Sequence, residues 1–484
     1  MEQEKQSGLR RSLSPMSVWA IAFGCIIGWG SFINPGKKFL PNSGVAGTTI
    51  AMILGALVMI VIAMSYAYMV PKYPKAGGEF TFTRARFGKI PAFICGWFLV
   101  AAYLTNVPMN STAIGLIIDG IFGPVLKWGF HYTIAGFEVW LGEIIVAGAI
   151  LIIFGILNII GVKKAGYVQT VLATLLIVCV FTLFIAALCS PYAKIENMAP
   201  WWGFDKSAAV AAGTYDEIFA NQSWISAILA TFAIAPWAFV GFDAIPQAAE
   251  EFKFSYKKVI FIMIIAIVFG CFVYCSNNAI TAAALENWPE LIVDAEGTPW
   301  LLLSAAEKML GVWGKILVGV GVSCAVLSGI MGFYLASSRL MYSMAKDGYL
   351  PAAFGKVDER FGTPKNAIVF CIIVSLTGPI LGREALGWFV DMSAIGASIG
   401  FLFTSLAAFA TLKECKDAKR GLSVFTILGA VFSAVFIILQ LVPIPGLDGV
   451  HFSWQSYLML GVWIVLGAAF YFKQRNKLDV QMLE

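Results

Sequence analysis

The chain contains 484 residues, of which 59% are hydrophobic and 13% charged, and its formal net charge is +5. A composition this apolar excludes an ordinary soluble domain, so lipid is the expected solvent for most of the chain. Runs such as Ile144–Ile160 do not alternate between polar and apolar residues, which excludes a membrane β-barrel, and the positive charge does not indicate a nucleic-acid-binding protein.

Apolar runs of about 20 residues, long enough to cross a bilayer as helices, recur along the chain. The run behind the polar N-terminal segment is too long for a signal peptide and lacks a cleavage site, so we expect it to be retained as the first span. The runs predict an all-α membrane protein with twelve transmembrane helices, at roughly residues 16–40, 44–70, 90–122, 138–160, 167–190, 223–250, 257–284, 313–345, 366–382, 387–411, 422–442 and 453–472.

The lysines and arginines predict the orientation. An even number of spans puts both termini on one side of the membrane, and most of the 33 basic residues lie in connections on that side. Basic residues accumulate on the cytoplasmic side. We therefore expect a multi-pass protein of the cell membrane whose two tails, 1–15 and 473–484, are both cytoplasmic.

Two of the predicted spans contain residues that interrupt helices. Span 1 carries Gly24, Gly28 and Gly30, and span 6 carries Pro236 and Gly241. Unwound backbone within a bilayer is tolerated only where it faces protein or a wet cavity. Taken alone, Gly24 and Gly28 are equally consistent with a seam that lets another helix pack closely.

The spacing of the two interrupted spans favours functional breaks. They are five spans apart, as an internal repeat of five helices requires. We therefore expect discontinuous helices 1 and 6 in a ten-helix transport core at 16–411, with repeat 1 at about 16–190 and repeat 2 at about 223–411, followed by two additional helices at 422–472.

The expected orientation assigns different chemistry to each break. The half-helix after the break in span 1 begins near Trp29–Ser31 with free N–H groups and the positive end of the helix dipole, which suits a carboxylate. The half-helix before the break in span 6 leaves carbonyl groups near Trp237–Val240 unpaired, which suits an ammonium group. Donors on one helix and acceptors on the other predict a zwitterion, such as an amino acid, as the substrate.

Four short motifs stand at the two breaks and at the ends of spans 2 and 8. They are Ile27–Phe32 (IGWGSF), Tyr73–Phe80 (YPKAGGEF), Phe239–Asp243 (FVGFD) with Glu250 and Glu251 beyond it, and Ser338–Arg339 followed by Ala345–Pro351 (AKDGYLP). In this order they resemble the motifs of the amino acid-polyamine-organocation (APC) superfamily of permeases, and the resemblance covers most of the chain. It implies a five-plus-five inverted repeat with two extra C-terminal helices that works by alternating access.

The resemblance also implies a binding site. Carried over position by position, it suggests that the N–H groups of Trp29 and Gly30 hold the substrate carboxylate. The carbonyl groups of Ile26, Trp237 and Val240 then hold the amino group. The expected substrate-binding residues are Ile26, Gly28, Trp29, Gly30, Ser31, Trp237, Phe239, Val240, Gly241, Asp243 and Asn106.

Two residues depart from the pattern of this superfamily. Trp29 stands where many relatives have serine or threonine, so a hydroxyl contact is missing and the indole reshapes the pocket. Leu176 stands near the position of a lysine that several proton-coupled relatives carry in span 5. Coupling by sodium, by exchange or by another proton-binding group therefore stays open.

Several polar residues inside the spans have two interpretations each. A carboxylate within a span costs about 2.5 kcal/mol or more, so Asp243 is either a cap on the second half-helix of span 6 or a contact for a cationic substrate or coupling proton. Ser323 and Ser328 form a sodium site with carbonyl groups of span 1, or they are ordinary packing serines. Asn106 lines the pocket or bonds a neighbouring helix.

Three of the charged residues between spans 2 and 3 have two interpretations. Glu79, Arg84 and Arg86 are interpreted either as a network that stabilises one access state or as a solvated charged face. Tyr103 and Phe239 are interpreted as gates or as packing residues.

The sequence favours a transporter over an enzyme. Its two histidines, His131 and His451, lie in connections outside any metal-binding motif, so we expect no catalytic residues, no metal and no cofactor, apart from coupling to sodium or protons. A polyamine or amine exchanger of the same fold, a channel and a transporter-like sensor are the alternatives. The expected partners are the small-molecule amino acid or amine and the lipid bilayer, with no nucleic acid.

Overall fold

The computed structural model describes residues 8–134, 136–220, 222–294, 300–382, 385–414, 420–444 and 451–480. Residues 1–7 and 481–484 of the two predicted tails lie outside the described residues. The main helices and strands are α1 Pro15–Ile26, α2 Gly30–Asn34, α3 Leu40–Met69, α4 Gly78–Phe87, α5 Lys89–Phe122, β1 His131–Ile134, β2 Phe137–Trp140, α6 Leu141–Ile160, α7 Val162–Cys189, α8 Lys206–Ala212, α9 Trp224–Phe232, α10 Ala235–Phe239, α11 Ala244–Gln247, α12 Val259–Ala284, α13 Trp288–Val293, α14 Leu301–Leu310, α15 Val312–Lys346, α16 Lys365–Ser375, α17 Thr377–Leu381, α18 Ala385–Glu414, α19 Arg420–Leu441 and α20 Trp454–Val480.

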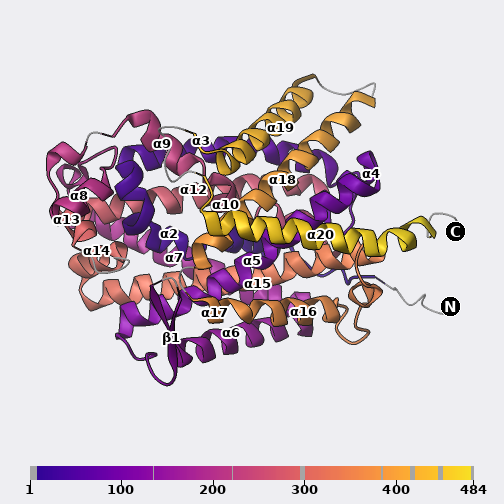
Figure 1. Cartoon of the computed structure of the whole chain (residues 1–484), viewed down its shortest axis with the longest axis horizontal. Coiled ribbons are helices and arrows are strands. Elements are labelled where there is room, and N and C mark those ends of the chain that lie inside the picture. The colour runs from indigo at the N-terminus through magenta and orange to yellow at the C-terminus, as the bar shows by residue number, and fades with distance from the viewer. Residues whose placement is uncertain are drawn as a thin grey trace.

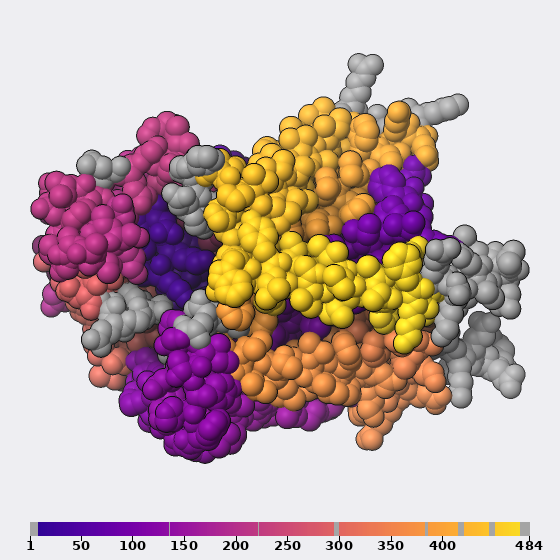
Figure 2. Space-filling view, in the orientation of Figure 1, coloured from indigo at the N-terminus to yellow at the C-terminus, as the bar shows by residue number. Residues whose placement is uncertain are grey.

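The long helices form an elongated bundle and run roughly along its long axis (Figure 1). Helix α5 packs against α15 and α18, and α15 also packs against α1 and α7, so α5 and α15 form the centre. Helices α6, α19 and α20 are the least enclosed, and Figure 2 shows α20 lying across one face. Helix α4 and the end of α20 lie at one end of the bundle, and α8, α13 and α14 lie at the other (Figure 1).

The helices confirm a helical membrane architecture. Among the residues that the structure describes, nine helices are long and apolar enough to cross a membrane. Two shorter apolar segments, Pro15–Ile26 and Lys365–Leu381, lie within predicted spans 1 and 9. Predicted span 6 is divided into α9, α10 and α11, because its backbone is interrupted twice. The count of twelve spans therefore stays a prediction.

A small β-hairpin precedes α6 and was not predicted. Strands β1 and β2 pair antiparallel with His131 opposite Trp140. Residues 138–140, which were predicted as the start of span 4, belong to β2, and α6 begins at Leu141. The reason is local, because both segments are rich in aromatic and β-branched residues and Gly136 adopts a φ of 87° at the turn.

Two of the motifs meet in a buried ion pair. Arg339, near the end of α15, donates to Glu251 over 3.0 Å, and the two side chains are 0% and 1% exposed. The carbonyl group of Glu251 also accepts hydrogen bonds from the backbone N–H groups of Ser12 and Leu13. Burial raises the pKa of Glu251, and the Arg339 guanidinium opposes that rise. This ion pair therefore ties the segment before α1 and the segment after α11 to α15.

Removing one partner of this ion pair is expected to destabilise the protein. Glu251→Gln leaves the Arg339 guanidinium buried without its counter-charge, which costs about 3–5 kcal/mol for a buried pair. The melting temperature of the purified protein in detergent should fall by several degrees. Glu250→Gln, at the half-exposed neighbouring position, is the matched control and should leave it unchanged; equal melting temperatures for both variants would refute the structural role.

Candidate functional site

The first break separates α1 from α2. Helix α1 ends at Ile26, Ile27 is extended with φ −95° and ψ 94°, and α2 starts at Gly30. Among the described residues, no backbone hydrogen bond outside the regular helices uses the N–H groups of Gly28, Trp29 or Gly30. The start of α2 therefore has free donors at Trp29 and Gly30, whereas the N–H of Ser31 donates to the carbonyl group of Gly28 over 3.3 Å and is not the free donor that the sequence predicted.

Helix packing accounts for Gly24, which precedes this break. A Cβ atom at Gly24 would lie 2.3 Å from Nε2 of Gln169 and 2.7 Å from Cβ of Ser328. The packing-seam interpretation therefore fits Gly24, where α7 and α15 approach α1. Gly28 is less crowded, and the carboxamide oxygen of Asn110 lies 3.3 Å from its Cβ position.

The second break separates α10 from α11. Helix α10 ends at Phe239, Val240 is extended with ψ 130°, and Gly241 has a φ of 135°, which disfavours any residue with a side chain. The carbonyl group of Trp237 accepts from the N–H of Val240 over 3.3 Å. Among the described residues, no backbone hydrogen bond outside the regular helices uses the carbonyl groups of Phe239 or Val240, so these acceptors are free.

The two breaks lie directly against each other. A Cβ atom at Gly241 would lie 2.5 Å from Cβ of Cys25 and 2.8 Å from the backbone nitrogen of Ile26. Only glycine permits this approach at a position with such a φ value. Donors of one broken helix and acceptors of the other therefore come together in one place, although their sequences are about 200 residues apart.

Helix α12 braces the first break, which the sequence analysis did not predict. The Tyr274 hydroxyl donates to the carbonyl group of Ile26 over 3.2 Å, and Nδ2 of Asn277 donates to the carbonyl group of Ser31 over 3.0 Å. The signal in the sequence was the presence of these polar residues within an apolar run. Because a carbonyl oxygen has two lone pairs, Ile26 retains one acceptor site for a ligand.

Two indoles cover the breaks. The rings of Trp29 and Trp237 have centroids 6.1 Å apart, and the residues are 4% and 6% exposed. Trp237 lies over Gly30, where a Cβ atom would come within 2.3 Å of its ring. Nε1 of Trp29 is buried without a hydrogen-bond partner, as is Oδ1 of Asn110. Buried polar atoms are normally paired, so these two atoms are available to a ligand at the breaks.

Asp243 is fully buried just beyond the second break. Its Oδ1 accepts from the N–H of Gly241 over 2.6 Å, and its Oδ2 accepts from the Tyr103 hydroxyl over 2.9 Å. The carboxylate therefore holds the shape of the break from within, but its side chain makes no capping hydrogen bond to α11, so the capping interpretation is wrong. Its bonds leave it less able to hold the cationic end of a substrate.

Glu79 is also buried, although it was interpreted as part of a charged loop. Its carboxylate accepts from the hydroxyl groups of Tyr66 and Tyr103 and from the amide of Gln247. Burial raises its pKa, and the charge of nearby Asp243 raises it further. The solvated-face interpretation is thus wrong for Glu79, because α4 packs this residue against α3, α5 and α11.

The two arginines of α4 do not share a network with Glu79. Arg84 pairs with Asp347, and Arg86 pairs with Glu414. Each arginine links α4 to a different helix end, so the three charged residues act at separate contacts.

Three further predicted residues, Asn106, Ser323 and Ser328, have positions that differ from the predicted binding roles. Nδ2 of Asn106 donates to the carbonyl group of Ala102 within α5 and to Oγ of Ser393 on α18, so only the second bond joins two helices. Ser328 donates to the carbonyl group of Gly24 over 3.4 Å. Ser323 is half-buried five positions earlier on α15, about 140° around the helix, so the two serines face different directions.

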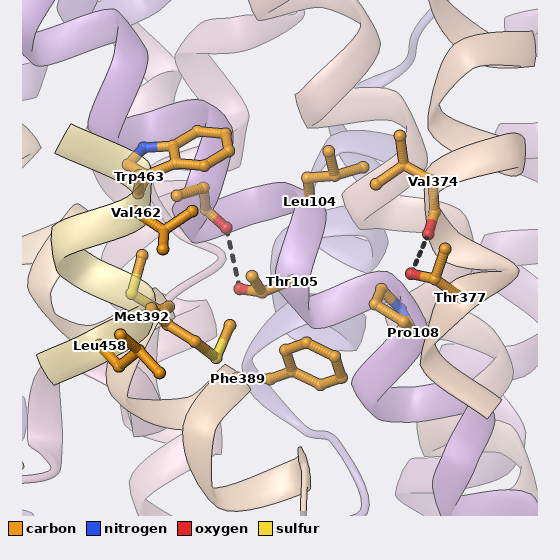
Figure 3. A pocket seen from close by; sticks show the side chains of 12 residues that line it. Leu104, Thr105, Pro108, Val374, Thr377, Phe389, Met392, Leu458, Val462 and Trp463 are labelled. Carbon is orange, nitrogen blue, oxygen red and sulfur yellow. Dashed lines mark hydrogen bonds between the residues drawn. The ribbon is translucent and has the colours of Figure 1, made fainter. Parts of the chain in front are cut away.

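An apolar groove on the outside of the bundle does not suit a polar substrate. It measures about 320 Å³ and lies between α5, α16, α17, α18 and α20 (Figure 3). The Thr105 and Thr377 hydroxyls in its wall donate to carbonyl groups of their own segments, at Ala101 and Val374 (Figure 3). Because these polar groups are already satisfied, the wall is suited to hydrocarbon.

Paired helix breaks within a multi-pass bundle are the architecture of a secondary transporter. The sequence profile of the amino acid permease family matches residues 13–468, and the chain belongs to this family. The expected transporter function, and the expectation that the chain is not an enzyme, are thereby confirmed.

Characterised relatives cover almost the whole chain. The branched-chain amino acid permease BcaP of Bacillus subtilis is 26% identical over 98% of this chain and 94% of the permease. The methylthioribose transporter of the same organism is 24% identical, over 98% and 95%. The serine/threonine exchanger SteT is 25% identical over 87% of each chain.

Replacing Gly241 is expected to abolish transport by separating the breaks. In Gly241→Ala the new methyl group collides with Cys25 and the backbone of Ile26, and the φ of 135° adds strain of about 1–3 kcal/mol. Uptake of substrate by the reconstituted variant should fall at least tenfold. Gly461→Ala in α20, where a Cβ atom meets nothing within 4 Å, is the control; full activity of both variants would show that the contact is dispensable.

Proposed function

We propose that this permease moves a zwitterionic amino acid across the cell membrane by alternating access, and that it binds the substrate between the two helix breaks. The observation that carries the proposal is the direct contact between the breaks, at Gly241 and Ile26. Free N–H groups at Trp29 and Gly30 complement the substrate carboxylate. Free carbonyl groups at Phe239 and Val240 complement its ammonium group.

The surroundings of the breaks favour a substrate with an uncharged side chain. The Asp243 carboxylate is the charged group nearest to the second break, and both its oxygens already accept hydrogen bonds. The remaining cover is provided by the rings of Trp29, Trp237 and Phe239. An apolar side chain fits against these rings without leaving a charge unpaired.

The membrane topology forms part of the same proposal. Twelve spans in a five-plus-five repeat, with repeats at about 16–190 and 223–411, would place the broken helices at equivalent positions of the two repeats. The positions of α4 and of the end of α20 at one end of the bundle support cytoplasmic termini, because the connections rich in lysine and arginine lie there (Figure 1).

Competition with substrate analogues tests the zwitterion site. The substrate is first identified by thermal stabilisation of the purified protein with the common amino acids. Removing either the carboxylate or the amine from the best amino acid should weaken its competition for uptake by roughly 10- to 100-fold, because each charged end loses hydrogen bonds worth about 1.5–3 kcal/mol. A decarboxylated amine that competes equally well would support the amine-exchanger alternative instead.

Flux through proteoliposomes separates the remaining alternatives. A transporter shows uptake that saturates with concentration and is accelerated by substrate on the opposite side. Linear flux with electrical conductance would indicate a channel, and ligand binding without flux would indicate a sensor.

The proposal also includes coupling of transport to sodium or to protons. The hydrogen bonds around Ser328 disfavour a sodium site there. Nε2 of Gln169 donates to the carbonyl groups of Ala20 and Ser328, and Ser328 donates to Gly24. A sodium ion at Ser328 would have to share carbonyl oxygens that each already accept a hydrogen bond, which weakens its coordination.

Sodium is therefore expected to have no effect on substrate affinity. The measurement is thermal stabilisation by the best substrate in sodium chloride and in choline chloride at equal ionic strength. A sodium-dependent increase in affinity that Ser328→Ala removes would overturn this expectation and restore the sodium site at Ser323 and Ser328.

A further inference from the structure

Two buried carboxyl groups are joined by a single tyrosine hydroxyl next to the second break. Glu79 lies in the first turn of α4, and Asp243 directly precedes α11; both are 0% exposed. The hydroxyl oxygen of Tyr103, from α5, lies 3.1 Å from Oε1 of Glu79 and 2.9 Å from Oδ2 of Asp243. Three separate elements therefore meet at one oxygen atom.

The Tyr103 hydroxyl has too few hydrogen atoms to bond both carboxyl groups when both are ionised. Tyr103 has one hydroxyl hydrogen, which can lie in only one of its two contacts with the carboxyl oxygens. Tyr66 donates its hydrogen to Glu79, and the Gly241 N–H donates to the other oxygen of Asp243. The amide of Gln247 donates to Glu79 and lies 3.4 Å from the Tyr103 hydroxyl, too far for a strong bond. If both carboxyl groups were ionised, one of the two contacts between the Tyr103 oxygen and a carboxylate oxygen would contain no hydrogen atom.

Among the residues that the structure describes, no lysine or arginine pairs with either carboxyl. Hydroxyls from α3 and α5, the thiol of Cys25 on α1 and the thiol of Cys95 on α5 are the other ionisable groups that face the two carboxyls. Phe333 of α15 stacks on Tyr103, and Phe401 of α18 packs on Tyr66.

We propose that Glu79 and Asp243 share one proton and that this proton is carried together with the substrate. The inference rests on the proposed function and names its coupling ion. The shared proton completes both contacts of Tyr103 and removes one negative charge, which allows α4 to stay against α11. Loss of the proton leaves two carboxylates facing each other across one hydroxyl oxygen, and their repulsion drives the two elements apart.

The proton site is connected to the substrate site through the backbone. The same Asp243 carboxylate accepts a hydrogen bond from the N–H of Gly241. Gly241 is the residue that touches α1 at the breaks. Separation of Asp243 from Tyr103 therefore changes the second break itself. The proton is bound in the arrangement in which the breaks touch, so substrate and proton are bound by the same state.

A polar hollow lies on the other side of α4 from the two carboxyls. It measures about 670 Å³ and is lined by Thr81, Arg84 and Asp347, among other residues. Thr81 is two positions beyond Glu79 and faces the opposite side of α4. A displacement of α4 is therefore enough to expose the proton site to this hollow.

Proteoliposome transport tests the proposal. The wild-type protein should accumulate substrate when the outside is more acidic, and counterflow should fall as the pH rises, because the raised pKa of Glu79 keeps the proton bound until that pKa is passed. Glu79→Gln cannot titrate, so it should lose accumulation driven by the pH gradient and show counterflow that no longer depends on pH. Glu286→Gln, at an exposed carboxyl in the connection after α12, is the matched control and should behave as wild type.

A measurement on the wild-type protein does not depend on the folding of any variant. Below the pKa of the two carboxyls no proton is taken up on binding, whereas above it one proton should be absorbed from weakly buffered detergent solution per substrate bound. Proton uptake of zero across pH 5 to 9, or accumulation by Glu79→Gln equal to wild type, overturns the shared proton. Absence of counterflow in the wild-type protein would instead contradict the proposed transport function, so the two failures can be distinguished.

Discussion

The contact between two stretches of unwound backbone determines the rest of this molecule. Backbone groups that leave a helix inside a membrane protein cannot be satisfied by lipid, so each needs a partner within the bundle. Gly241 brings the second break against Ile26 of the first. Tyr274 and Asn277 hold the carbonyl groups on either side of the first break, and Asp243 holds the second.

The backbone N–H and carbonyl groups that stay unpaired at the two breaks explain how a site can arise without a dedicated binding side chain. Helix ends supply N–H groups at one break and carbonyl groups at the other, and under the proposed function these bind the carboxylate and the ammonium group that all amino acids share. Two relatives, at 26% and 25% identity, are named for branched-chain amino acids and for serine and threonine. A site made from backbone tolerates such divergence, because the surrounding side chains can vary while the backbone geometry is kept.

Two buried carboxyl groups, Glu251 near α15 and Glu79 on α4, face partners of opposite charge. The charge of the partner separates a structural role from a switching role. Glu251 faces the Arg339 guanidinium, so the ionised pair is held together by attraction. Glu79 faces Asp243 across the Tyr103 hydroxyl, so these two carboxyl groups stay together only while they share a proton. Both contacts are buried, and burial strengthens attraction in the first and repulsion in the second.

The sequence by itself determined the helical membrane architecture and the family resemblance, because lipid imposes long apolar runs and because clustered glycine and proline favour a helix break. It also located both breaks, at Gly28–Gly30 and near Gly241, and it assigned donors to one and acceptors to the other. Only the tertiary structure decided that the breaks touch, that α12 braces them, and that Glu79 is buried against Asp243 rather than solvated. These features depend on packing between helices that are distant in the chain, and hydrophobic periodicity along one helix carries no information about which residue of another helix it will meet.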